Sequence, residues 1–78
     1  MTADRLSAPS PEQLAAMILA EVRQASGLDL SSDSLALARI QEAAASGARE
    51  LTLAPEAEID LPFLSANQQG PIHYHRLV

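Results

Sequence analysis

Two histidines near the end of the chain are the residues most suited to metal chemistry. His73 and His75 are two positions apart, so in a strand both side chains would project to one face. With Glu58 or Asp60 as a third ligand, they could hold a metal ion. Such a pair is more often a surface feature or a pH-sensitive contact. We therefore expect no metal site.

Other catalytic chemistries have no matching pattern. The chain has no cysteine, which excludes thiolate nucleophiles, thiolate metal sites and disulfides. It has no glycine-rich phosphate loop, and no serine has a base and an orienting acid marked by spacing. We expect a protein that is not an enzyme and binds no cofactor.

The charge of the chain limits its partners. Five basic residues stand against ten acidic ones, giving a net charge of -5. Nucleic acids and anionic membranes are bound by neutralising negative charge, so both are unfavourable partners. No segment approaches the roughly 20 apolar residues that span a bilayer, and none resembles a signal peptide. The sequence predicts a cytoplasmic protein.

The size of the chain predicts marginal stability. A domain of 78 residues with one Phe, one Tyr and no Trp must build its core from Leu, Ile and Ala. Domains this small bury only about 60% of the surface that the unfolded chain exposes. We expect residues 1 to 9 to be a disordered lead-in and residues 10 to 78 to form a single domain, completed by a protein partner or by self-association.

Start and stop signals define a first helix. Ser10-Pro11-Glu12-Gln13 combines a serine N-cap, a proline at the first helical position and a glutamine that closes a capping box. Gly27 is the stop signal. We predict a helix over residues 11 to 26, with a buried stripe formed by Leu14, Met17, Ile18, Val22 and Ala25.

A second helix follows a short apolar link. Cap candidates ending at Asp33 predict a helix over residues 33 to 50. Gly47 lies in mid-helix, where glycine costs about 1 kcal/mol relative to alanine. Small residues there predict the close approach of another element. The predicted stripe is Leu37, Ile40, Ala44 and Leu51.

The last part of the chain has the period of a β-hairpin. From residue 57 to 66 the hydrophobic period changes to two, with Glu58 and Asp60 on one face. This pattern predicts a strand with Ile59, Leu61 and Phe63 on the core side. Pro62 cannot donate a ladder hydrogen bond, so this strand should lie at an edge. Residues 67 to 71 form a turn, and residues 72 to 78 return, with Ile72 and Tyr74 also on the core side. The predicted fold is α+β, two helices packed on an antiparallel hairpin.

An ordered set of residues resembles subdomain IIB, one lobe of the Hsp70 nucleotide-binding domain. The matching residues keep the family spacing without gaps: Gly27-Leu28-Asp29-Leu30, Asp33, Ala36-Leu37, Arg39-Ile40, Glu42-Ala43-Ala44, Glu50-Leu51-Thr52, Leu61-Pro62-Phe63-Leu64, Ala66 and Gly70-Pro71-Ile72-His73. In the family this lobe is two helices against an antiparallel hairpin. The resemblance therefore implies the same fold as the periodicity.

The beginning of the chain resembles a different part of Hsp70. Residues 10 to 19 look like a family segment of the form [ST]-P-E-E-I-S-A-M-I-L, which lies far upstream in another subdomain. The resemblance implies an Hsp70 relative in which this helix replaces the lobe's own first helix. Chance similarity in a well-capped, alanine-rich helix is the alternative.

The resemblance also implies which residues would contact a nucleotide. In the family the second helix lays a Glu, a Lys, an Arg-type position and a Ser against adenosine. The matching positions here are Ala45, Ala48, Arg49 and Thr52. An alanine methyl supplies neither hydrogen bonds nor charge. Arg49 and Thr52 remain as residual nucleotide-binding candidates, with a solvated helix end as the alternative.

In Hsp70 this lobe is also held by nucleotide-exchange factors. The resemblance thus implies a non-catalytic protein-interaction module, with an exchange factor among its possible partners. The alternative is a structural or accessory subunit that keeps the fold without chaperone or nucleotide function. The final strand lacks the segment that covers it in the family, so we expect partner contacts at Leu77 and Val78, with Arg76 limiting association.

Overall fold

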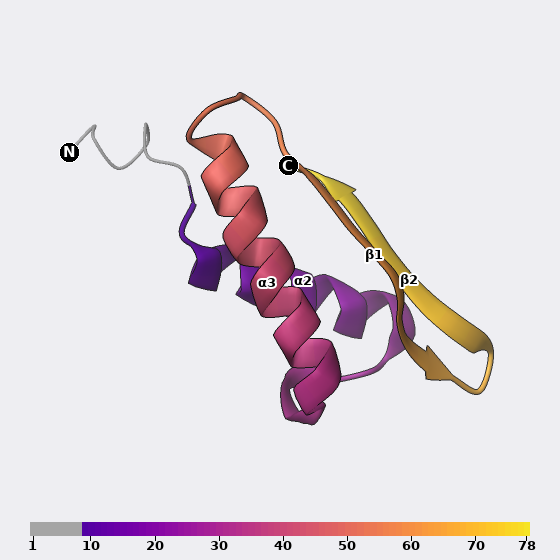
Figure 1. Cartoon of the computed structure of the whole chain (residues 1–78). Coiled ribbons are helices and arrows are strands. Elements are labelled where there is room, and N and C mark those ends of the chain that lie inside the picture. Colours follow the sequence, from indigo (N-terminus) through magenta and orange to yellow (C-terminus); the bar gives the residue numbers. More distant parts are fainter. Residues whose placement is uncertain (1–8) are drawn as a thin grey trace.

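The computed structural model describes residues 9 to 78; the lead-in predicted for residues 1 to 9 lies, but for its last residue, outside the described residues. Five elements follow in order: α2 (Pro11–Ser26), the 3-10 turn η1 (Leu30–Ser32), α3 (Ser34–Leu51), β1 (Glu58–Asn67) and β2 (Gly70–Leu77). Figure 1 labels the helices α2 and α3 and the strands β1 and β2. The strands pair antiparallel in a two-stranded sheet. The predicted α+β fold is confirmed.

The predicted capping box begins α2. The Ser10 hydroxyl accepts the Gln13 N–H at 3.1 Å, and the Gln13 side-chain oxygen accepts the Ser10 N–H at 2.8 Å. At the other end Gly27 has φ 79°, and its N–H donates to the Arg23 carbonyl at 2.8 Å. A left-handed residue in this position is the common helix stop. The sequence signals thus predict both ends of α2 correctly.

The link between the helices is more ordered than the sequence indicated. Residues Leu30–Ser32 form the turn η1, which the sequence reading missed. The Asp29 carboxylate accepts the Ser31 hydroxyl at 2.6 Å and the Ser31 N–H at 3.0 Å. These bonds lower the pKa of Asp29. Asp33, the last of the cap candidates in the sequence, then caps α3 by accepting the Ala36 N–H at 3.1 Å.

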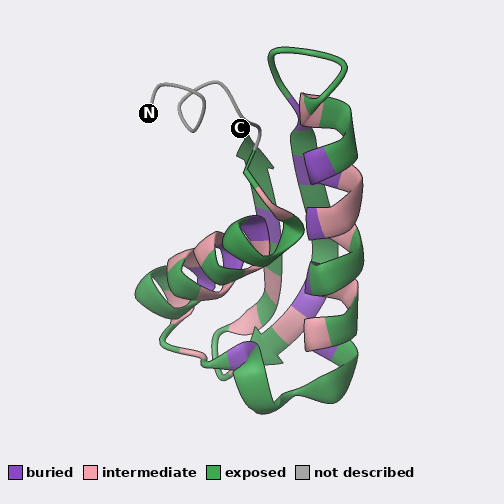
Figure 2. Cartoon of the chain, turned by 90° about the vertical axis from the view of Figure 1, so that its left-hand side faces the viewer, coloured by how far each residue is buried: buried purple, intermediate pink, exposed green. Residues whose placement is uncertain are grey.

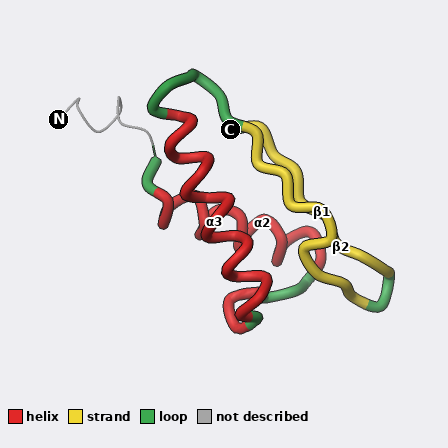
Figure 3. Tube along the Cα trace, viewed as in Figure 1, coloured by secondary structure: helices red, strands yellow, loops and turns green. Residues whose placement is uncertain are grey.

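The two helices lie on one face of the hairpin and enclose the core against it (Figure 2). Figure 3 shows the long hairpin beside the two crossing helices. The buried stripe of α2 runs through Leu14, Ile18 and Val22, in steps of four residues. The next step is Ser26, which explains why Ala25 is exposed and its predicted place in the stripe is wrong. The remaining buried apolar residues in the described part of the chain are Leu30, Ala36, Ile40, Ala44, Ala48, Ala57, Ile59, Leu61, Leu64 and Tyr74.

An irregularity in β1 overturns one predicted core residue. The strands pair Leu61 with Tyr74 and then Ser65 with Ile72, so residues 62 to 64 lie opposite His73 alone. Phe63 consequently takes a left-handed φ of 54° and is 70% exposed, while Leu64 is only 5% exposed. The prediction that Phe63 faces the core is therefore wrong. The simple alternation fails only locally, because the left-handed backbone at Phe63 turns this side chain outward and brings Leu64 to the core.

Gly47 gives a stability prediction. A Cβ at this position would lie 3.5 Å from Ile59 Cγ1 and 3.6 Å from Leu14 Cδ1, which is ordinary contact. We expect Gly47→Ala to raise the free energy of unfolding by about 0.5 to 1 kcal/mol, because alanine is the better helix former. Urea unfolding followed by circular dichroism measures the change. The matched control Gly27→Ala should lower the free energy of unfolding, because alanine is strained at the φ of 79° found there. A lower free energy of unfolding for Gly47→Ala would contradict the ordinary contacts with Ile59 and Leu14 described above.

Candidate interaction surface

The strand β2 has one edge whose backbone groups lack partners among residues 9 to 78. Ala57 and Val78 exchange both backbone hydrogen bonds at 2.9 Å. In an antiparallel pair the inward and outward residues alternate. The backbone N–H and C=O groups therefore point toward β1 at Tyr74, Arg76 and Val78. They point away from β1 at His73, His75 and Leu77. We call the outward backbone N–H and C=O groups of His73, His75 and Leu77 the open edge.

The edge of β1 differs, because its backbone groups are partly occupied. Pro62 has no N–H, and the Arg39 guanidinium donates to the carbonyls of Pro62 and Phe63, both at 2.9 Å. The Phe63 N–H donates to Nδ1 of His73 at 2.8 Å, with the two rings edge to face at 4.6 Å. Pro62 thus lies in an edge strand, as predicted. Another strand would find few free groups at this end of β1.

The side chains predicted to bind a partner occupy different environments. Leu77 is 55% exposed, whereas Val78 is half-buried and packs against the core. Arg76 forms an ion pair with Glu21 of α2. Of the three predicted residues, Leu77 alone presents a large exposed apolar surface beside the open edge. Their role in binding a partner stays a prediction.

Glu21 connects α2 to β2 through one carboxylate. Its Oε1 accepts the Tyr74 hydroxyl at 2.7 Å, and its Oε2 pairs with Arg76. Sequence reasoning missed this group, because Glu21 lies far from both partners along the chain and nothing in its spacing marks it. Burial raises the pKa of Tyr74, and the hydrogen bond to Glu21 raises it further.

The raised pKa of Tyr74 predicts a loss of stability at alkaline pH. The unfolded tyrosine ionises near pH 10, whereas the folded one holds its proton to higher pH. The contribution of the protonated Tyr74 hydroxyl to the free energy of unfolding is therefore complete below about pH 10. This contribution falls as the pH rises above that value. The chain has one tyrosine, no lysine and no cysteine. No other type of side chain in it therefore titrates in this alkaline pH range. Urea unfolding between pH 8 and 11.5 should show the decline, and Tyr74→Phe should remove it; an equal decline in that variant would contradict the assignment.

The two histidines make hydrogen bonds within the hairpin. His75 Nε2 lies 2.6 Å from Glu58 Oε2, and His73 Nδ1 is occupied by the Phe63 N–H. Among the described residues, no three His, Asp or Glu side chains gather as ligands for a metal. The histidines thus stabilise strand pairing and the irregularity in β1.

The residual nucleotide positions lie near the end of α3. Ala48 is buried and packs with Leu14 and Ala44, so this position belongs to the contact between the helices. Arg49 and Thr52 are exposed, and the Thr52 hydroxyl donates to the Arg49 carbonyl at 2.6 Å. The hydroxyl therefore completes the helix end. A nucleotide contact at Arg49 and Thr52 stays a prediction.

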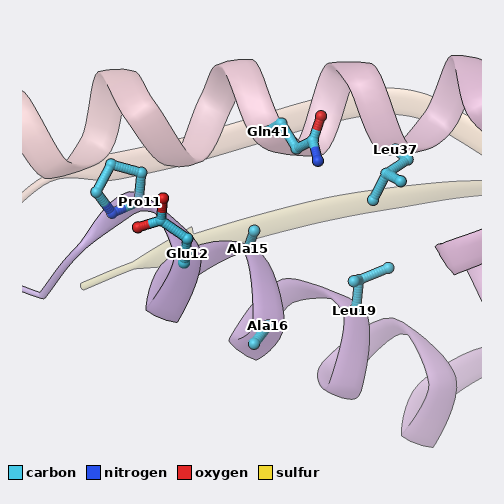
Figure 4. A pocket seen from close by; sticks show the side chains of 7 residues that line it. All are labelled: Pro11, Glu12, Ala15, Ala16, Leu19, Leu37 and Gln41. Carbon is cyan, nitrogen blue, oxygen red and sulfur yellow. The ribbon is translucent and has the colours of Figure 1, made fainter.

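A groove of about 400 Å³ lies between α2 and α3 (Figure 4). Its apolar wall includes Leu19 and Leu37, and its polar side chains are Glu12 and Gln41. None of the lining residues carries a positive charge, so the groove offers nothing to neutralise a phosphate. In residues 9 to 78, no helix has the length and apolar character needed to cross a membrane.

Comparison of the amino-acid sequence with known proteins identifies a matching family. The family model described as "Hsp70 protein" matches residues 11–78. The chain is 44% identical over 61 residues to the "Heat shock 70 kDa protein, mitochondrial" of Trypanosoma cruzi, covering 78% of this chain and 9% of that protein. It is 48% identical over 56 residues to the "Heat shock 70-related protein 1, mitochondrial" of Leishmania major, covering 72% of this chain and 9% of that protein.

Proposed function

The chain belongs to the Hsp70 family, and from that premise we propose that it is a non-catalytic protein-interaction module. It spans about 9% of the length of the relatives described above. The lobe that it resembles is the one that nucleotide-exchange factors hold in Hsp70. The observation that supports the proposal is the open edge, where backbone donors and acceptors lie beside the exposed Leu77.

An open strand edge supplies affinity in a well-known way. A partner strand satisfies the free N–H and C=O groups, and neighbouring side chains select the partner. Here the helices cover one face of the hairpin (Figure 2), and a strand added at β2 would extend the sheet at its outer edge. The partner class that we propose is a nucleotide-exchange factor that binds at β2.

Amide shifts of the labelled chain, titrated with a purified exchange factor, test this proposal. We expect perturbations at His73, His75 and Leu77, and roughly tenfold weaker binding after Leu77→Lys, because a charge replaces the apolar contact. Leu35→Lys is the matched control, since Leu35 is 80% exposed on α3, away from β2. Absence of binding, or equal weakening by both substitutions, would overturn the proposal.

The non-catalytic part of the proposal has its own test. Ala45 and Ala48 stand where the family places two adenosine contacts, and Ala48 is committed to helix packing. We therefore expect no heat of binding when millimolar ATP is titrated into the chain. Saturable binding with shift changes at Arg49 and Thr52 would contradict this expectation and favour a residual nucleotide site.

The cellular compartment stays a prediction. The sequence favoured the cytoplasm, whereas the two relatives described above carry "mitochondrial" in their names. Imaging of the tagged full-length gene product in its host would decide between the two.

A further inference from the structure

The open edge is complementary to itself. Its three residues, His73, His75 and Leu77, each offer one N–H and one C=O in the same direction. A second copy presents the same row, and two such rows run antiparallel when a two-fold axis passes between them. The edge can therefore bind a second copy without any change in the fold.

Proline restricts the register of such a pair. Pro71 also lies on the outward side of β2, where its ring replaces the N–H. A two-fold axis at Tyr74 would place Pro71 opposite Leu77 of the second copy, and the ring would meet that residue's carbonyl. An axis at His75 pairs His73 with Leu77 of the second copy and His75 with itself. Every outward donor and acceptor of the open edge is then satisfied.

Side chains on the helix-covered face favour the same register. With the axis at His75, Tyr74 lies beside Arg76 of the second copy, and Ile72 lies beside Val78. An aromatic ring beside a guanidinium and two adjoining aliphatic side chains are favourable neighbours. An axis at Arg76 would instead set two arginines against each other, and an axis at Tyr74 would set Ile72 against Arg76. Both arrangements are less favourable.

We propose that the open edge binds a second copy of the chain, through an antiparallel β2–β2 pair centred on His75. The inference rests on the proposed function, because it needs the edge to accept a strand. A second copy and an exchange factor would compete for the same backbone groups, so the pair forms when the exchange factor is absent. The two hairpins join into one continuous sheet. The edge of β1 stays outside the pair. Two of its carbonyls already accept hydrogen bonds from Arg39, and Pro62 has no N–H to donate.

Cysteine cross-linking tests the register, because the chain has no cysteine of its own. Hydrogen-bonded antiparallel neighbours have Cα atoms about 5.5 Å apart, within reach of a disulfide. We expect His75→Cys to form a covalent dimer under mild oxidation at least tenfold faster than the turn control Gln69→Cys. His73→Cys and Leu77→Cys should cross-link when mixed with each other, and neither should do so alone.

Each alternative register has its own signature. Cross-linking of His73→Cys with His75→Cys would indicate an axis at Tyr74, and His75→Cys with Leu77→Cys an axis at Arg76; either result overturns the proposed register. Sedimentation of the unmodified chain should show a dimer that increases with concentration. A monomer at all concentrations overturns the inference. If the exchange factor still binds in a manner sensitive to Leu77→Lys, the proposed function survives that result.

Discussion

Replacing Leu64 by alanine is expected to lower the free energy of unfolding by about 2 to 5 kcal/mol, the usual cost of deleting a buried leucine side chain. The same replacement at Phe63 should cost about 1 kcal/mol or less, because its ring is 70% exposed and lies edge to face with the ring of His73. Since a domain of this size has little stability in reserve, Leu64→Ala should leave much of the chain unfolded at 25 °C. Urea unfolding followed by circular dichroism measures both variants.

The relative size of the losses from Leu64→Ala and Phe63→Ala distinguishes an irregular strand β1 from a regular one. Strict alternation from Ile59 and Leu61 would put Phe63 in the core and Leu64 in solvent, and would reverse the order. The structure instead places two extra residues of β1 opposite His73. A larger loss at Phe63 than at Leu64 would show that the strand is regular. Leu53→Ala is a matched control, because Leu53 is 89% exposed and should change stability by less than about 0.5 kcal/mol.

The sequence predicted the helices because their signals are local. The capping box at Ser10 and the left-handed stop at Gly27 act within a few residues and appear where expected. The cap at Asp33 is one of the local candidates that the sequence offered. Hydrophobic period also separated the helices from the hairpin. The turn η1 escaped detection because it depends on one carboxylate that bonds Ser31, a pattern shared with ordinary loops.

The irregularity in β1 was beyond local reasoning. A non-glycine residue with φ of 54° pays a conformational cost of roughly 1 to 2 kcal/mol. Hydrogen bonds from Arg39 in α3 and to His73 in β2 offset that cost. Both partners are distant in sequence, so only the folded chain shows why Phe63 turns outward. Pro62 signalled an edge strand, but it did not indicate that the alternation is interrupted at the next residue.

The candidate surface was predictable in its location and not in its details. The apolar end of the last strand pointed to β2, which has the open edge. The roles of individual side chains differ, because Arg76 bonds α2 and Val78 packs on the core. The alternation that decides which backbone groups face outward follows from the register, which the sequence left unspecified.

Glu21→Ala is expected to lower the free energy of unfolding by about 1.5 to 3 kcal/mol, the usual range for hydrogen bonds to charged groups. The substitution leaves the hydroxyl of the buried Tyr74 without its acceptor and removes the partner of Arg76. Most of the loss should come from Tyr74, because the Arg76 side chain is 47% exposed and exposed ion pairs contribute little. Urea unfolding at pH 7 measures the effect.

A double-mutant cycle with Tyr74→Phe separates these contributions. If the hydroxyl bond dominates, Tyr74→Phe should cost clearly less in the Glu21→Ala background than alone, because the bond is already gone there. Glu42→Ala is the matched control, since Glu42 is an exposed glutamate in α3 and forms none of these contacts. Equal losses from Glu21→Ala and Glu42→Ala, or strictly additive effects in the cycle, would show that Glu21 does not hold α2 against β2. In that case β2 would depend on apolar packing alone, and the position of the open edge relative to the helices would be less firmly fixed.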